Sequence, residues 1–180
     1  KEVKKEMTVK AGQKCTAIRR IFVPENKMED AWKAIAAELD KTTIGNPLNE
    51  KVRMGSMAGL TQREEVRAQV QKLLASSAVI YGSLDSVNVV DADANEGAFL
   101  SPLLLLNKEP FTGEETHNIE AFGPVSTIMP YKNMDEAIAL SKKGKGSLCS
   151  SIVTAAPAYA KQYVLDAASQ LSYISTPSSG

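Results

Sequence analysis

Apolar residues recur along this chain at two spacings, one typical of helices and one typical of strands. Four segments have apolar positions three and four residues apart, as on one face of a helix; they lie over 27–40, from Thr61 onward, over 133–144 and from Pro157 onward. Three of them begin with polar pairs that favour a capping box, namely Asn26 with Glu29, Thr61 with Glu64, and Asn133 with Glu136, and Pro157 suits a first helical position. With a further helical pattern over 2–10, the sequence predicts five helices.

Short β-branched or leucine-rich runs lie between these segments and predict strands. They cover 18–23, 79–81, 87–90, 99–106, 125–129, 150–153 and 172–175. Strands that alternate with helices are typical of an α/β domain with a largely parallel sheet, whose functional loops gather at one sheet edge. We therefore predict one such domain over 1–180, with an exposed polar loop over 112–119.

Composition narrows the class of protein. The 180 residues carry 21 Lys plus Arg against 21 Asp plus Glu, and this balance argues against nucleic acid or an anionic membrane as a partner. No apolar run is long enough to cross a bilayer, and the polar opening KEVKKEMTVK lacks the apolar centre of a signal peptide. Cys15 and Cys149 have no partner at metal-ligand spacing, so we expect two thiols, no metal site and a soluble cytoplasmic protein.

Cys15 is the first candidate for chemistry. It follows a glycine and precedes a predicted strand, so its sulfur is expected in a loop, where neighbouring Lys14 would favour the reactive thiolate. For a lone cysteine the commoner interpretation is a buried or bystander residue. Residue chemistry alone therefore leaves both interpretations open.

A second candidate segment is Glu120-Ala121-Phe122-Gly123-Pro124-Val125. Taken alone, Glu120 would be an ordinary solvated acid and Phe122 an ordinary core residue. A carboxylate can, however, accept from two neighbouring hydroxyls at once, as in a ribose.

Together these two segments resemble the aldehyde dehydrogenase family. GQKCTAIRR matches the family's Gly-Gln-x-Cys-x-Ala-x-x-Arg signature at every fixed position, and EAFGPV matches its Glu-x-Phe-Gly-Pro-Val motif. The resemblance implies that Cys15 is the nucleophile that attacks an aldehyde. It also implies that Glu120 binds the nicotinamide ribose of NAD or NADP and that Phe122 packs beside the nicotinamide.

The resemblance spans nearly the whole chain, including MGSMAGLTQREEV and YKNMDEAIALSKKGKGSLCSSIVT. It is strongest to a subgroup that oxidises CoA-linked semialdehydes in aromatic-acid catabolism. That subgroup includes the dehydrogenase part of bifunctional phenylacetate-degradation proteins fused to a MaoC-type hydratase, and semialdehyde dehydrogenases of the benzoyl-CoA pathway. One departure is Ile119, which stands where the family often has a second acid. Members of the family are expected to be homo-oligomers when full length.

Two parts of the family's machinery are expected before this segment. They are a glutamate general base and a dinucleotide-binding domain, and fourteen residues precede Cys15. We therefore expect a partial catalytic domain that is inactive alone. Two alternatives stay open, a folded piece without catalytic function and an acyl-phosphate reductase of the same fold.

Three further features receive mainly structural interpretations. Cys149 is expected to be a small core residue of a strand, and His117 to be an exposed loop histidine. Lys142, Lys143 and Lys145 around Gly144 and Gly146 could meet a phosphate, but cations at the end of a helix also complement its dipole.

Overall fold

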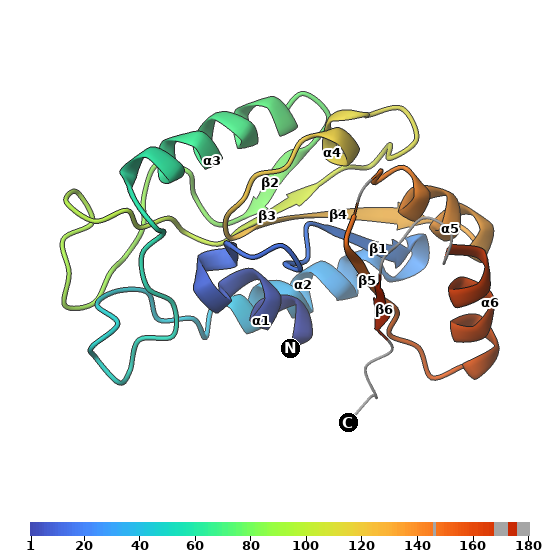
Figure 1. Ribbon diagram of the computed structural model, residues 1–180, viewed down its shortest axis with the longest axis horizontal. Coiled ribbons are helices and arrows are strands. Elements are labelled where there is room, and N and C mark those ends of the chain that lie inside the picture. The colour runs from blue at the N-terminus through green and yellow to red at the C-terminus, as the bar shows by residue number, and fades with distance from the viewer. Residues whose placement is uncertain (146, 168–172, 176–180) are drawn as a thin grey trace. The chain divides into compact units, whose positions relative to one another are not determined.

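The computed structural model describes residues 1–145, 147–167 and 173–175 and divides into two units, Lys1–Pro130 and Tyr131–Gly180. Elements that begin in the first unit are α1 (Glu2–Thr8), the 3-10 helix η1 (Val9–Gly12), β1 (Arg20–Pro24), the 3-10 helix η2 (Glu25–Lys27), α2 (Met28–Leu39), α3 (Leu60–Leu73), β2 (Ala78–Tyr81), β3 (Leu103–Leu106), α4 (Glu115–Asn118) and β4 (Val125–Tyr131) (Figure 1). The second unit holds α5 (Met134–Lys142), β5 (Cys149–Ser151), α6 (Pro157–Ala167) and β6 (Tyr173–Ser175).

Four strands form one sheet in the order β1-β4-β3-β2. β3 and β4 run parallel, with Leu103 opposite Val125, whereas β2 and β3 run antiparallel, with Ala78 opposite Leu106. The predicted α/β class is confirmed, and the four-stranded sheet contains an antiparallel pair, β2 with β3, beside the parallel pair of β3 with β4.

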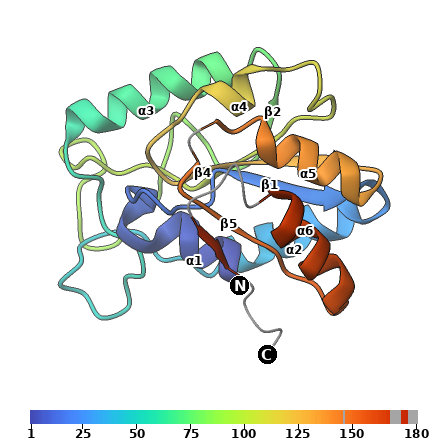
Figure 2. The same cartoon turned by 45° about the vertical axis from the view of Figure 1, so that its right-hand side comes forward.

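Helices cover the two faces of this sheet. In both ribbon views α3 lies on one side of β4, and α1 and α2 lie on the other side (Figures 1 and 2). On the α3 side, Val66, Val70 and Leu73 belong to the same core cluster as Leu103 and Leu105 of β3. A strand covered on both faces reads as a continuous apolar run, which explains the four leucines of β3.

A tyrosine hydrogen bond connects β2 to the end of α2. The hydroxyl of Tyr81 donates to Oδ1 of Asp40 at 2.9 Å. Burial, followed by the bond to the Asp40 carboxylate, raises the pKa of Tyr81 to about 12.

Only one of the three predicted capping pairs forms. At α5, Oδ1 of Asn133 accepts from the backbone N–H of Glu136 at 3.0 Å, and α6 begins at Pro157 as predicted. At α2 the predicted cap was wrong, because the helix begins one residue later, at Met28, with Lys27 as its cap, and Asn26 lies in η2.

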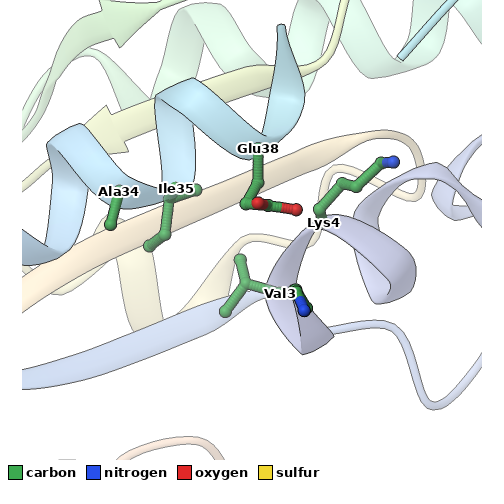
Figure 3. Close-up of a pocket in the computed structure, with 6 residues that line it drawn as sticks. Val3, Lys4, Ala34, Ile35 and Glu38 are labelled. Atoms are coloured by element: carbon green, nitrogen blue, oxygen red, sulfur yellow. The ribbon is translucent and has the colours of Figure 1, made fainter. Parts of the chain in front are cut away.

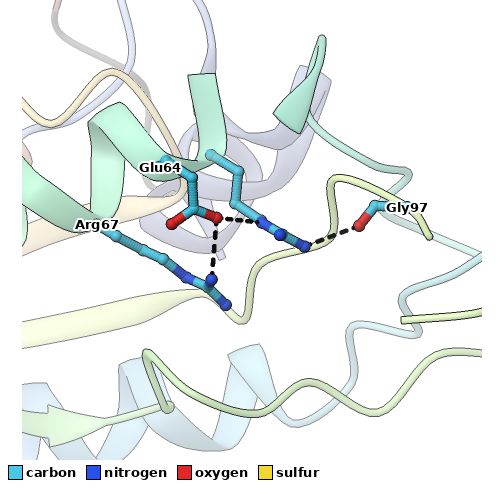
Figure 4. Close-up of polar contacts among 4 residues, drawn as sticks. Glu64, Arg67 and Gly97 are labelled. Atoms are coloured by element: carbon cyan, nitrogen blue, oxygen red, sulfur yellow. Dashed lines mark hydrogen bonds and ion pairs between the residues drawn. The ribbon is translucent and has the colours of Figure 1, made fainter. Parts of the chain in front are cut away.

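The predicted cap of α3 was also wrong. The helix begins at Leu60, after Gly59, so Thr61 already lies inside it. Glu64 instead accepts from Arg63 at 2.9 Å and from Arg67 at 3.0 Å, while Arg63 also donates to the carbonyl of Gly97 at 2.9 Å (Figure 4). These bonds fasten α3 to the loop that leads to β3.

Three other predictions need correction. Segment 87–90 is not a strand and has only a single bridge, between Gly45 and Val90. The strand predicted over 99–106 shortens to β3, since Pro102 has no N–H to donate to a ladder. The polar stretch 112–119 contains the short helix α4 rather than only loop.

In the second unit α5 and α6 pack together around Ile138, Tyr163 and Ala167. The hydroxyl of Tyr163 donates to Oγ of Ser141 at 3.0 Å, which fixes the buried faces of the two helices. β5 and β6 pair in parallel, as Cys149 lies opposite Tyr173. The predicted strand residue Ser172 and the final segment STPSSG lie outside the described residues, apart from Ser175, which ends β6.

Candidate active site

Cys15 lies in a tight turn between η1 and β1, and it is exposed. Backbone hydrogen bonds close this turn on both sides of the thiol: Lys14 N–H donates to the Gly12 carbonyl at 2.9 Å and Ala17 N–H to the Lys14 carbonyl at 3.1 Å. The structure thus places the cysteine in a loop before a strand, as the sequence predicted.

The backbone before Cys15 adopts an unusual conformation. Three consecutive residues, Lys10, Ala11 and Gly12, have φ of 53°, 51° and 70°, in the left-handed region. Residues with a Cβ pay about 1 to 2 kcal/mol each for this conformation, so tertiary packing must hold it. Ala11 is buried, which supplies that packing.

Gly12 brings the two sequence motifs into direct backbone contact. A Cβ placed on Gly12 would lie 2.2 Å from the carbonyl oxygen of Gly123 and 2.8 Å from the nitrogen of Pro124. The Gly-Gln-x-Cys turn therefore packs against the Phe-Gly-Pro turn with no room for a side chain between them.

A third segment completes this packing. Oε1 of Gln13 accepts from the backbone N–H of Ala58 at 2.7 Å, and Met57 and Val66 lie where a Cβ on Gly123 would point. The fixed Gln of the first motif thus anchors the Cys15 turn to the glycine-rich turn before α3.

Glu120 and Phe122 both face solvent beside this junction. The side chain of Glu120 is 54% exposed and Phe122 is 43% exposed, whereas Ala121 between them is buried. Oε1 of Glu120 lies 3.8 Å from Nη1 of Arg19, whose side chain is 25% exposed. An accessible carboxylate and an accessible ring thus lie on the same short segment as the contact to Gly12.

Lys14 has a different role from the predicted one. Its ammonium pairs with the carboxylate of Glu6 in α1, so its charge is compensated there rather than held for the thiolate. The physical reason is proximity, since α1 folds back beside the turn. Cys15 therefore differs from Cys149 in its exposure and in its position in a turn, rather than through Lys14.

His117 is buried, so the prediction of an exposed loop histidine was wrong. It is 2% exposed; its Nε2 lies 2.7 Å from the Pro110 carbonyl and its Nδ1 lies 3.1 Å from Nη1 of Arg20. A carbonyl only accepts and a guanidinium only donates, so these partners fit the neutral ring with its proton on Nε2. Arg20, the fixed arginine of the first motif, thereby ties β1 to α4. Arg20 is a fixed position of the first motif, but nothing in the sequence indicated that its partner would be the buried His117.

The remaining candidates lie elsewhere. Cys149 is half-buried at the start of β5. Lys142 ends α5, and Lys143 and Lys145 follow it, as cations that complement a helix dipole do. Gly146 lies outside the described residues. Within the described residues no group of three or more His, Cys, Asp or Glu side chains could hold a metal ion. In the same part of the chain, no helix has the length and apolar character needed to span a membrane.

A hollow of about 300 Å³ lies between α1 and α2. Val3 and Lys4 line it from one helix, and Ala34, Ile35 and Glu38 from the other (Figure 3). Neither Cys15, Glu120 nor Phe122 lines it, so it is not the site that the motifs predict.

Comparison with known proteins decides the family. The sequence model of the aldehyde dehydrogenase family matches residues 1–174. The chain belongs to this family. It is 37% identical over 164 residues to 3,4-dehydroadipyl-CoA semialdehyde dehydrogenase of Aromatoleum evansii, covering 91% of this chain and 32% of that protein. It is also 38% identical over 117 residues to Protein MaoC of Klebsiella aerogenes, covering 64% of this chain and 33% of that protein.

Solved aldehyde dehydrogenase structures share the fold. Betaine aldehyde dehydrogenase of Staphylococcus aureus superposes with a TM-score of 0.85 at 20% identity, over 97% of this chain and 34% of that one. A 3,6-anhydro-L-galactose dehydrogenase superposes with a TM-score of 0.84 at 17% identity, over 97% of this chain and 35% of that one. The chain thus spans about a third of the length of the relatives it matches.

Proposed function

We propose that this chain supplies the nucleophile and the nicotinamide end of the cofactor site in an NAD(P)-dependent dehydrogenase that oxidises a CoA-linked semialdehyde. The observation that carries the proposal is the backbone contact between Gly12 and Gly123, because it joins the cysteine turn to the segment of Glu120 and Phe122. Two motifs that are far apart in the sequence thereby form one surface.

The exposed residues fit the cofactor that the family uses. Glu120 offers carboxylate oxygens to the two ribose hydroxyls, and the accessible ring of Phe122 offers an apolar surface to the nicotinamide. When bound, NAD(P) supplies the hydride acceptor. Its adenosine end is assigned to the family's dinucleotide-binding domain.

Cys15 performs the covalent steps. Its thiolate adds to the aldehyde carbon, and the carbonyl oxygen becomes an oxyanion that the backbone N–H of Cys15 is suited to stabilise. Loss of hydride from this thiohemiacetal leaves a thioester on Cys15. Water, which loses a proton to the glutamate base that the family resemblance implies, then attacks the thioester, and this releases the carboxylic acid and regenerates the Cys15 thiolate.

The substrate class rests on the relatives. The Aromatoleum evansii protein is named for a CoA semialdehyde, and the Klebsiella aerogenes match fits a dehydrogenase of the bifunctional type in phenylacetate degradation. We therefore assign the substrate to the CoA-linked semialdehydes of aromatic-acid catabolism.

A Cys15→Ala variant of the full-length protein tests this function. We expect loss of semialdehyde oxidation with nearly unchanged NAD(P) affinity, because the nucleophile rather than a binding group is removed. Cys149→Ala is the matched control and should retain activity. Turnover by Cys15→Ala, or a product that forms only with phosphate present, would contradict the proposed reaction.

A further inference from the structure

We infer that Arg19 is a positioning residue that holds the carboxylate of Glu120 ready for the cofactor. The inference rests on the proposed role of Glu120. It assigns a function to a residue outside the fixed positions of the cysteine signature.

The two adjacent arginines hold the two ends of one segment. Arg20 binds His117 and Arg19 pairs with Glu120, three residues further along. Adjacent residues of an extended chain point to opposite sides, so the two guanidinium groups have different surroundings.

Only the second contact is accessible to a ligand. His117 is 2% exposed and has partners on both ring nitrogens, so the Arg20 contact is a fixed structural link. The Glu120 side chain is 54% exposed and lies 3.8 Å from Arg19, longer than a hydrogen bond. This geometry orients the carboxylate by charge and leaves its oxygens able to accept from hydroxyl groups.

The backbone on both sides of the pair is anchored to the same strand. The carbonyl of Arg19 accepts from Thr127 N–H at 2.9 Å, and the carbonyl of Ile18 accepts from the Ser126 hydroxyl. Ser126 and Thr127 belong to β4, which begins five residues after Glu120. Arg19 therefore starts from a fixed backbone position, and the cost of ordering Glu120 is met before the cofactor arrives.

Arg19→Met in the full-length protein tests the inference. Because exposed ion pairs contribute little, we expect the Kd and KM for NAD(P) to rise about two- to fivefold with little change in kcat. The loss should shrink at high salt, where the pair is screened, and Arg19→Lys should restore much of the affinity. Lys33→Met, which breaks the exposed pair with Glu29 on α2, is the matched control and should change none of these values.

A double-mutant cycle with Glu120→Gln separates the possible outcomes. If Arg19 acts through Glu120, adding Arg19→Met to Glu120→Gln causes no further loss. Equal losses in both backgrounds, or tighter cofactor binding by Arg19→Met, would overturn the inference while the role of Glu120 stands. Normal cofactor binding together with normal hydride transfer in Glu120→Gln itself would instead overturn the proposed function of that residue.

Discussion

At the scale of single residues, exposure separates the functional candidates from their structural counterparts. Cys15 is exposed whereas Cys149 is half-buried, and Glu120 and Phe122 are accessible although the residue between them is buried. A group that must meet a substrate or cofactor needs this access. Cys15, Glu120 and Phe122 occupy fixed positions of the two family motifs. Ala121, by contrast, occupies a variable position of its motif, and Cys149 lies in neither motif.

Alkylation should distinguish the two thiols. With limiting iodoacetamide, Cys15 is expected to be modified several times faster than Cys149, because its sulfur lies in an exposed turn and that of Cys149 starts a strand. Peptide mass spectrometry would give both rates, with Cys15→Ser and Cys149→Ser identifying the sites. Faster modification of Cys149 would argue against the assigned nucleophile.

Replacing Glu120 by Gln should affect the cofactor and not the acyl group. The change keeps the size and removes the charge, so a charge-assisted hydrogen bond to ribose becomes a neutral one. We expect a loss of about 1 to 3 kcal/mol in cofactor affinity or hydride transfer, with thioester hydrolysis largely spared. Kinetics with a pre-formed thioester would separate the two steps. Equal loss of hydride transfer and of thioester hydrolysis would contradict the cofactor role and leave Glu120 as an ordinary solvent-exposed acid.

The positions of the motif residues relative to the predicted elements could be predicted, because their sequence signal is local. The motifs place Cys15, Glu120 and Phe122, and the structure brings their segments together through Gly12 and Gly123. Lys14 pairs with Glu6 of α1, and His117 lies 3.1 Å from Nη1 of Arg20, 97 positions away in the sequence. Sequence spacing contains no signal for such contacts, which is why the exposed position predicted for His117 was wrong and the ion pair of Lys14 was not predicted.

At the scale of elements, apolar periodicity predicted most helices and strands, and their ends less well. Helix starts depend on one or two hydrogen bonds that compete with other partners. Glu64, for example, binds Arg63 and Arg67 instead of capping α3. Segment 87–90 has strand-forming valines and lacks a neighbouring strand to extend its single bridge, so intrinsic preference did not decide its structure.

The contact between the two motif turns can be tested with one methyl group. Gly12→Ala should destabilise the full-length protein by at least about 2 kcal/mol, since φ is +70° and the new Cβ would lie 2.2 Å from the Gly123 oxygen. Gly55→Ala is the matched control, because its Cβ would meet only Pro47 at 3.8 Å. Equal urea midpoints for the two variants would show that the turns do not need this close approach.

The cap of α5 offers a second test at this scale. Asn133→Ala removes the acceptor for the Glu136 N–H and should cost about 1 kcal/mol, with faster hydrogen exchange at that amide. Lys27→Ala at α2 removes a cap residue that makes no side-chain hydrogen bond and should cost much less. Similar losses at both positions would contradict the assigned cap.

At the scale of the whole molecule, the sequence predicted an α/β fold and the structure adds that its main sheet is mixed. Strand direction depends on pairing across long sequence separations, such as that of β3 with β4, and the local pattern of a strand does not encode it. The division into the units Lys1–Pro130 and Tyr131–Gly180 was likewise not predicted, because no linker-like composition marks the boundary.

A polypeptide of these 180 residues alone is expected to bind thiol reagents and yet not oxidise a semialdehyde. Nucleophilic attack needs only the exposed Cys15 turn, whereas turnover also needs a bound hydride acceptor and a base for the thioester. Among the described residues, Glu120 and Phe122 offer contacts for the nicotinamide end of NAD(P), and the chain spans about a third of the length of its relatives. The expected result is that Cys15 is alkylated but no NAD(P)H is formed, whereas the full-length protein, as the active control, forms NAD(P)H. Sustained NAD(P)H formation by the 180-residue polypeptide would show that base and cofactor site both lie within it.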